Sequence, residues 1–109
     1  MIATRLVLGP AALKDYVALD LETTGLAPYW DEIIEVGALR VRGGEVSEHF
    51  TSLVKPRNEI DEFIIDLTGI TNEMVADAPP IGEVLPQLRA FIGQDVVVGH
   101  NVNFDVNFL

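Results

Sequence analysis

Apolar residues along this 109-residue chain fall into short runs, spaced first with the period of a β-strand and later with that of a helix. Residues 16–22, 32–41 and 45–54 are expected to form strands, and Gly43-Gly44 between the last two predicts a tight hairpin turn. The first run is apolar at successive positions up to its acidic end. This pattern predicts a central strand that is buried on both faces.

Helical spacing replaces the strand pattern after a loop at 55–58. A short helix is expected at 61–67, and Thr71 can cap a further short turn. A longer helix is predicted over 81–92, with Gly93 as its stop and Pro86 marking either its start or a kink. One apolar face supports this longer helix, formed by Ile81, Val84, Leu85, Leu88 and Ile92.

The last third of the chain returns to strand character at 95–99 (DVVVG) and then begins another helix over 103–109. A helical crossover leads back to the first sheet, so the 95–99 strand is expected to lie parallel to a neighbour. Residues 1–15 show no periodic signal beyond a short extended piece and are interpreted as a leader. Residues 16–109, in the order β-β-β-α-α-β-α, predict one α/β domain with a mixed sheet.

Composition narrows the classes of function. Seventeen acidic residues against seven Lys and Arg give a net charge of −10, which argues against a broad basic surface for nucleic acid. A polyanion would therefore have to be held locally. The chain has no cysteine, which excludes disulfides and thiolate metal sites and fits a cytoplasmic protein. No apolar run approaches the length of a membrane span, so no membrane partner is expected.

Two carboxylates, Asp20 and Glu22, end the first apolar run, where they do not serve packing. Positions i and i+2 of a strand share one face, so both side chains can converge on one cation. Two negative charges about 5 Å apart repel by about 3 kcal/mol at an effective dielectric constant of about 20, so a positive partner is expected. Oxygen ligands without cysteine favour Mg²⁺ or Mn²⁺ over Zn²⁺. The alternative is a strand end with two solvated carboxylates.

A third acidic residue, Asp105, follows the last predicted strand, at the edge where open α/β sheets place their sites. The alternative reading of Asp105 is an exposed acid in the first turn of a helix. Of the two histidines, His49 is expected at the surface and His100 is expected as a buried imidazole bonded to backbone.

These residues fit a known pattern. YVALDLETTGL (16–26) and VVVGHNVNFDVNFL (96–109) resemble the first and second signature motifs of the DEDD-type 3′-5′ exonucleases, a group that includes the proofreading domains of bacterial DNA polymerase III. The connector LTGITNEMVADAPPIGEVLPQLRAFIG (67–93) is similar to that of the polymerase-associated members. The resemblance implies a ribonuclease-H-like mixed sheet with an antiparallel hairpin and a helical crossover.

The resemblance also implies roles for individual residues. Asp20 would bridge two divalent ions, Mg²⁺ or Mn²⁺, Glu22 would bind one of them, and Asp105 would support the site. These three are the expected catalytic and metal-binding residues. The expected contacts to the terminal nucleotide are Thr23, Thr24, Gly25, Leu26, Ile70 and Phe104.

The family's third motif, a His followed five residues later by an Asp, does not occur in the chain. That motif supplies the general base and the remaining metal ligand, so the chain is expected to be the C-terminally truncated front portion of a longer domain and inactive alone. Apolar surface left uncovered on the helix 103–109 and on the sheet predicts that the chain self-associates or exchanges elements with a second copy.

The expected substrate is a single-stranded 3′ end, DNA in the first instance, cleaved to nucleoside 5′-monophosphates, with DNA polymerase III subunits as further partners. Two alternatives stay open: an exoribonuclease that trims RNA 3′ ends, and a non-catalytic module that binds metal, nucleotide or a polymerase.

Overall fold

One four-stranded sheet organises the computed structural model, which describes residues 14–25 and 31–99. The strands are β1 (Tyr16–Thr23), β2 (Ile33–Arg42), β3 (Glu45–Leu53) and β4 (Val97–Val98), in the spatial order β3-β2-β1-β4. The first three form an antiparallel meander, and β4 pairs parallel to β1. The mixed sheet and the parallel last strand confirm the predicted fold class.

Three helices connect β3 to β4: α1 (Glu62–Thr68), α2 (Asn72–Val75) and α3 (Ile81–Ile92). The sequence reading counted two helices here, because it treated the segment after Thr71 as a turn. Thr71 does cap it, since its hydroxyl accepts a hydrogen bond from the Met74 backbone N–H at 3.2 Å, and the capped turn closes into α2.

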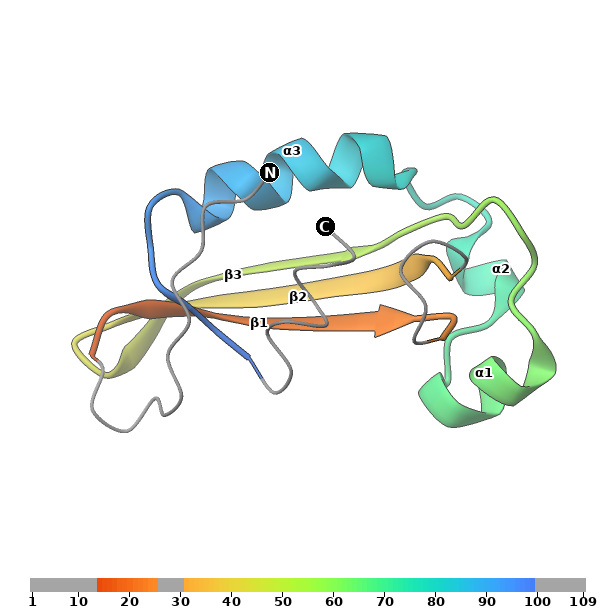
Figure 1. Ribbon diagram of the computed structural model, residues 1–109, viewed down its shortest axis with the longest axis horizontal. Helices are drawn as coiled ribbons and strands as arrows, with labels where there is room; N and C mark the ends of the chain where they lie inside the picture. The colour runs from red at the N-terminus through yellow and green to blue at the C-terminus, as the bar shows by residue number, and fades with distance from the viewer. Residues whose placement is uncertain (1–13, 26–30, 100–109) are drawn as a thin grey trace.

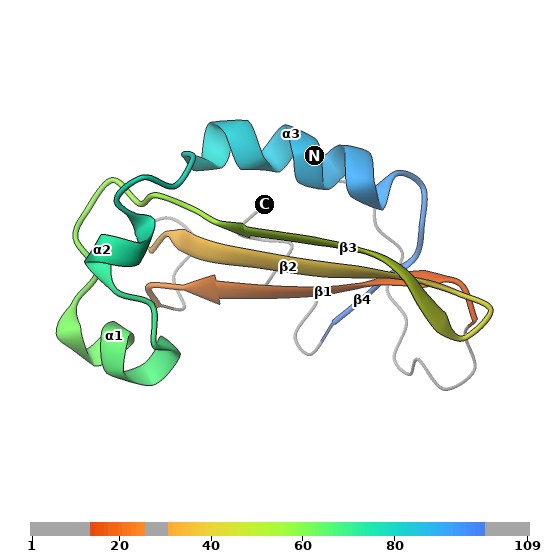
Figure 2. The ribbon, with the colours of Figure 1, turned by 180° about the vertical axis from the view of Figure 1, so that it is seen from behind.

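The helices divide between one face and one end of the sheet. Helix α3 lies across one face, whereas α1 and α2 sit beyond the end at which β1 finishes (Figures 1 and 2). The main core lies between α3 and the sheet and includes Val17, Leu19, Val36, Val84 and Leu88. A second, smaller core joins β2 to α1 and α2 through Ile34, Ile60, Ile64, Ile70 and Val75.

Helix α3 runs through Pro86 without ending. A proline inside a helix removes one backbone hydrogen bond and crowds the carbonyl four residues before it. Here that carbonyl belongs to the exposed Gly82, and Pro86 is itself exposed, so water can solvate the freed oxygen. Val84 and Leu88 are buried on the other face as predicted, while Ile81 stays 37% exposed.

Burial of β1 on both faces was wrong for the described residues. Val17, Leu19 and Leu21 are buried towards α3, whereas Ala18 is only half-buried and Asp20 is exposed. The physical reason is the placement of the described helices, because none of them covers the face that holds Asp20 (Figure 1).

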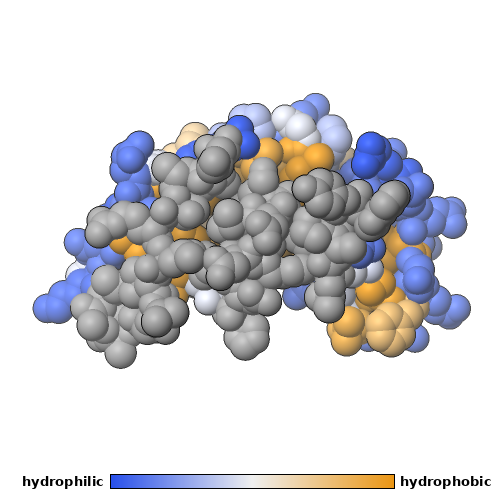
Figure 3. Space-filling view, viewed as in Figure 1, coloured by the Kyte–Doolittle hydropathy of each residue, from blue (hydrophilic) through white to orange (hydrophobic). Residues whose placement is uncertain are grey.

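The surface view shows hydrophobic side chains gathered over α1 amid hydrophilic ones (Figure 3). Phe63 and Leu67, one helical turn apart on α1, are 70% and 71% exposed. Among residues 14–25 and 31–99, no helix has the length and apolar character needed to cross a membrane.

Candidate active site

Strand β1 brings Asp20 and Glu22 to the sheet face opposite α3. Their neighbours Leu19 and Leu21 point the other way and are buried, so strand alternation sets both carboxylates on the open face. The register places Gly37 of β2 directly opposite Asp20 and Glu35 opposite Glu22. The predicted sharing of one face by the two carboxylates therefore holds in the structure.

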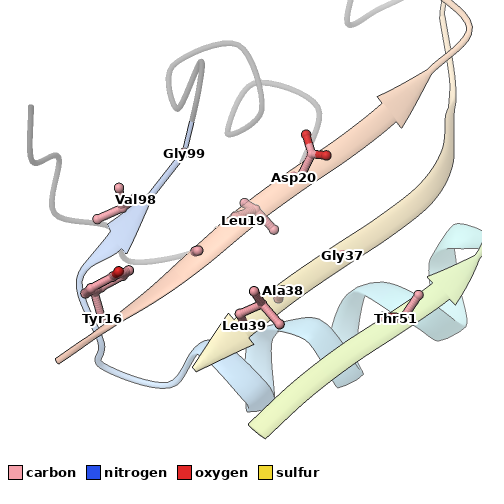
Figure 4. Close-up of a pocket in the computed structure, with 10 residues that line it drawn as sticks. Tyr16, Leu19, Asp20, Gly37, Ala38, Leu39, Thr51, Val98 and Gly99 are labelled. Carbon is pink, nitrogen blue, oxygen red and sulfur yellow. The ribbon is translucent and has the colours of Figure 1, made fainter. Parts of the chain in front are cut away.

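A hollow of about 570 Å³ lies beside Asp20. Figure 4 shows the Asp20 side chain standing off β1, with Gly37 of β2 on one side and Gly99, which follows β4, on the other. Because Gly37 has no side chain, the surface next to Asp20 stays open. Leu39 and the Tyr16 ring line the hollow further along, so among the described lining residues Asp20 is the one charged side chain of a largely apolar surface.

Electrostatic strain concentrates on Glu22. Its pKa is raised above the ordinary value, first by partial burial and then by the negative charges of Asp20 and Glu35. Like charges held close together disfavour ionisation, and a bound cation relieves that repulsion. The donor set, two carboxylates with no thiolate, fits a divalent ion that prefers oxygen ligands.

The pair does not complete a metal site within the part of the chain that the structure describes. Residues 14–25 and 31–99 contain no group of three or more His, Cys, Asp or Glu side chains that could hold an ion. Asp105, the third predicted ligand, lies outside the described residues, as do Leu26, Phe104 and His100. His49 is exposed on β3, in line with its predicted surface position.

The segment after Glu22 leaves the sheet through a shift in register between Glu22 and Thr23. The Thr23 hydroxyl donates to the Gly25 carbonyl at 2.6 Å, which closes a tight turn. Thr24 is bound reciprocally to Glu32: its backbone N–H donates to the Glu32 carbonyl at 2.8 Å, and its hydroxyl accepts from the Glu32 N–H at 2.8 Å. Thr23, Thr24 and Gly25 are thus held immediately beside the carboxylates.

Ile70, a predicted nucleotide contact, lies in the second core. Its side chain is 4% exposed and packs with Ile34, Ile60 and Ile64, and its backbone N–H donates to the Thr68 hydroxyl at 3.1 Å. Ile70 lies in the turn between α1 and α2, and its side chain packs in the core that these helices share with β2. The contact of Ile70 with a terminal base stays a prediction.

Sequence reasoning missed Glu35 and Glu32. The β1–β2 register sets Glu35 opposite Glu22, but the sequence does not fix that register, because a long connection rather than a tight turn joins the two strands. Glu32 gave no local signal, because its partners lie 25 and 26 residues away at Arg57 and Asn58.

Comparison with known proteins agrees with this geometry. The family described as "RNase_T: Exonuclease" matches residues 17–109. Among curated relatives, the chain is 44% identical over 94 residues to "DNA polymerase III PolC-type" of Oceanobacillus iheyensis, covering 86% of this chain. It is 45% identical over 96 residues to the protein of the same name from Bacillus subtilis (strain 168), covering 88% of this chain. In both cases the chain spans 7% of the relative's length.

Solved structures give the same result. A structure of "Exonuclease X in complex with 5′ overhanging duplex DNA" is 32% identical, with a TM-score of 0.74, and the match covers 86% of this chain and 53% of that one. "Exonuclease I (apo)" is 20% identical with a TM-score of 0.76, covering 87% of this chain and 23% of the other, which shows likeness of fold. With the paired carboxylates of β1 and the mixed sheet that presents them, the chain belongs to the DEDD-type exonuclease family.

Proposed function

We propose that this chain acts as part of a metal-dependent 3′-5′ exonuclease of the DNA-proofreading type. It would remove nucleotides from a single-stranded 3′ end and release nucleoside 5′-monophosphates. The observation that carries the proposal is the pair Asp20 and Glu22, which share the face of β1 opposite α3 and follow the segment of β1 that pairs with the parallel strand β4. Membership of the family supports the reaction class.

The proposed site residues have two roles, metal binding and nucleotide binding. Asp20 and Glu22 would hold Mg²⁺ or Mn²⁺, two ions in the complete domain, with Asp105 supporting them. Bound there, divalent ions would supply positive charge that stabilises a phosphate undergoing in-line displacement. Thr23, Thr24 and Gly25, in the rigid turn beside the pair, would position the terminal nucleotide, and Leu26 and Phe104 would add apolar contacts.

DNA is the favoured substrate and a replicative polymerase the favoured assembly. Two observations support this choice: the curated relatives are named as DNA polymerases, and the related exonuclease X was solved with duplex DNA. The net charge of −10 fits a protein that holds phosphates only locally, at a cation site. The cysteine-free sequence is consistent with a cytoplasmic location for such an enzyme.

Metal binding provides the first test. Titration with Mn²⁺ should raise the melting temperature of the parent chain, since a ligand that binds only the folded state stabilises it. Asp20→Asn should abolish the rise. Glu45→Gln, which removes one exposed negative charge at the opposite end of the sheet, should preserve it. Identical responses from the parent chain and Asp20→Asn would refute the site.

Hydrolysis provides the second test. Without the third motif, the 109-residue chain should show negligible cleavage of a 3′-labelled single-stranded DNA with Mg²⁺, because loss of a general base alone typically costs about 10²- to 10⁴-fold in rate. Extending the chain with the segment that follows the second motif in a PolC-type relative should restore cleavage, and Asp20→Ala should remove it again. Cleavage that survives Asp20→Ala would contradict the proposal.

A further inference from the structure

Glu32 stands at the centre of a hydrogen-bonded network that joins the active-site turn to the helical end of the molecule. Its backbone binds Thr24 in both directions, as described above. Its side chain points the other way along the chain, towards residues 57 and 58. Glu32 is neither a proposed metal ligand nor a proposed nucleotide contact, so the network needs a different explanation.

Three N–H groups donate hydrogen bonds to the Glu32 carboxylate. One oxygen accepts from the Arg57 backbone N–H at 2.7 Å, and the other accepts from the Asn58 backbone N–H at 3.2 Å and from its side-chain amide at 3.3 Å. The side chain is 17% exposed. Burial alone would raise the pKa of Glu32, but these hydrogen bonds and the Arg57 charge outweigh burial and lower it. The carboxylate is therefore held ionised, in one orientation.

Beyond Asn58 the network continues into the helices. The Asn72 side chain, at the first position of α2, accepts from the Ile60 N–H at 2.7 Å and donates to the Ile60 carbonyl at 3.1 Å. Residue 60 is buried in the second core. Glu32 therefore holds residues 57–58, and Asn72 of α2 holds residue 60, two positions further along the same loop.

The Thr23–Gly25 turn, which follows Asp20 and Glu22, also contacts the Asp31 side chain. The Thr24 hydroxyl donates to the Asp31 carboxylate at 3.3 Å. A Cβ added to Gly25 would overlap that carboxylate, so the Asp31 side chain would have to move away from the turn to make room for it. Thr24, Glu32, Asn58 and Ile64 also line one small cleft of about 190 Å³ between this turn and α1.

We infer that Glu32 is a positioning residue: by joining the Thr23–Gly25 turn to the 57–58 turn, it sets the affinity for the 3′-terminal nucleotide without contacting the metal. The inference rests on the proposed function, since the turn matters only if it binds a nucleotide. A glutamine at this position has the same shape but one acceptor oxygen fewer, and its amide group would face N–H donors. The geometry therefore requires the carboxylate.

Two binding measurements on the full chain separate this role from a general structural one. In the presence of Mg²⁺, calorimetric titration with thymidine 5′-monophosphate should show an affinity that falls by about tenfold to a hundredfold in Glu32→Gln, as expected for misplaced substrate contacts. Mn²⁺ alone should bind Glu32→Gln within about twofold of the parent, because the metal ligands are not partners of Glu32. Glu59→Gln, an exposed carboxylate in the same cleft, should change neither affinity.

Gly25→Ala gives a second variant should Glu32→Gln fail to fold. It leaves the Glu32 carboxylate in place but displaces Asp31 from the turn, and it should weaken nucleotide binding while retaining Mn²⁺. Unchanged nucleotide affinity in a folded Glu32→Gln, or equal loss of metal and nucleotide, would overturn the inference. A failure of the proposed function is distinct, because Asp20→Asn would then leave both affinities unchanged.

Discussion

At the scale of single residues, the proximity of Glu22 to Asp20 and Glu35 acts against the stability of the chain at neutral pH. The pKa of Glu22 lies above its unfolded value of 4.5 because of partial burial, Asp20 and Glu35. The folded chain therefore binds this proton more tightly than the unfolded chain, and the free energy of unfolding decreases as the pH rises through that range. At neutral pH the ionised Glu22 is a source of repulsion, which a divalent ion would relieve.

Glu22→Gln should accordingly raise the melting temperature at pH 7 in the absence of metal. The gain should disappear below pH 4.5, where Glu22 of the parent is protonated in both states. With saturating Mn²⁺ the order should reverse, because the variant loses a ligand. Thermal melts with EDTA and with Mn²⁺ at both pH values would check this. A variant that is less stable than the parent in EDTA at pH 7 would contradict the repulsion.

At the scale of elements, helix α3 contains one glycine, Gly82, and is followed by another, Gly93. The two positions differ in the backbone conformation that the residue must adopt. Gly82 lies inside the helix, and an added Cβ would meet nothing within 4 Å. Gly93 ends the helix with φ 57° and ψ −126°, a region that side chains rarely allow, and its N–H donates to the Arg89 carbonyl at 2.9 Å. Open space surrounds both positions, so only the backbone conformation distinguishes them.

Gly82→Ala should therefore stabilise the chain by about 0.5–1 kcal/mol, since alanine loses less backbone entropy in a helix. Gly93→Ala should destabilise it by about 1–3 kcal/mol through backbone strain. Urea unfolding followed by circular dichroism would measure both. Equal effects of the two substitutions would mean that the end of α3 can relax to a different geometry.

At the scale of the whole molecule, charge and apolar surface act against each other on α1. Phe63 and Leu67 form an exposed apolar pair, while Asp61, Glu62 and Asp66 surround it and the chain as a whole has a net charge of −10. Two copies that meet through this face would bring like charges together. Salt screens such exposed charges over about 8 Å at physiological ionic strength and over shorter distances in stronger salt.

Self-association, expected from the sequence, should thus increase with salt. Sedimentation velocity should show larger species in 1 M than in 0.05 M NaCl, roughly the range over which the Debye length falls below 10 Å. Phe63→Ser with Leu67→Ser should suppress them. Val46→Ser, which removes a 60% exposed apolar side chain at the opposite end of the sheet, serves as the control. Species that diminish as salt rises would instead indicate an electrostatic contact.

The sequence by itself determined the features that arise from neighbouring residues. Strand alternation placed Asp20 and Glu22 on one face, and Gly43-Gly44, with φ of 60° and 81°, formed the predicted hairpin turn. Gly93 ended α3 and Thr71 capped α2 as expected. These outcomes follow from backbone geometry and local hydrogen bonds, which a window of a few residues contains.

Tertiary structure alone decided which groups from distant segments meet. Among residues 14–25 and 31–99, α3 covers only one face of β1, whereas both faces were expected to be buried. Packing between α1 and α2 drew Ile70 into the core, and the β1–β2 register set Glu35 against Glu22. The Glu32 carboxylate accepts hydrogen bonds from Arg57 and Asn58 because the fold brings these segments, 25 and 26 residues apart in sequence, next to each other. Contacts of this kind depend on the relative placement of whole elements, which no local pattern specifies.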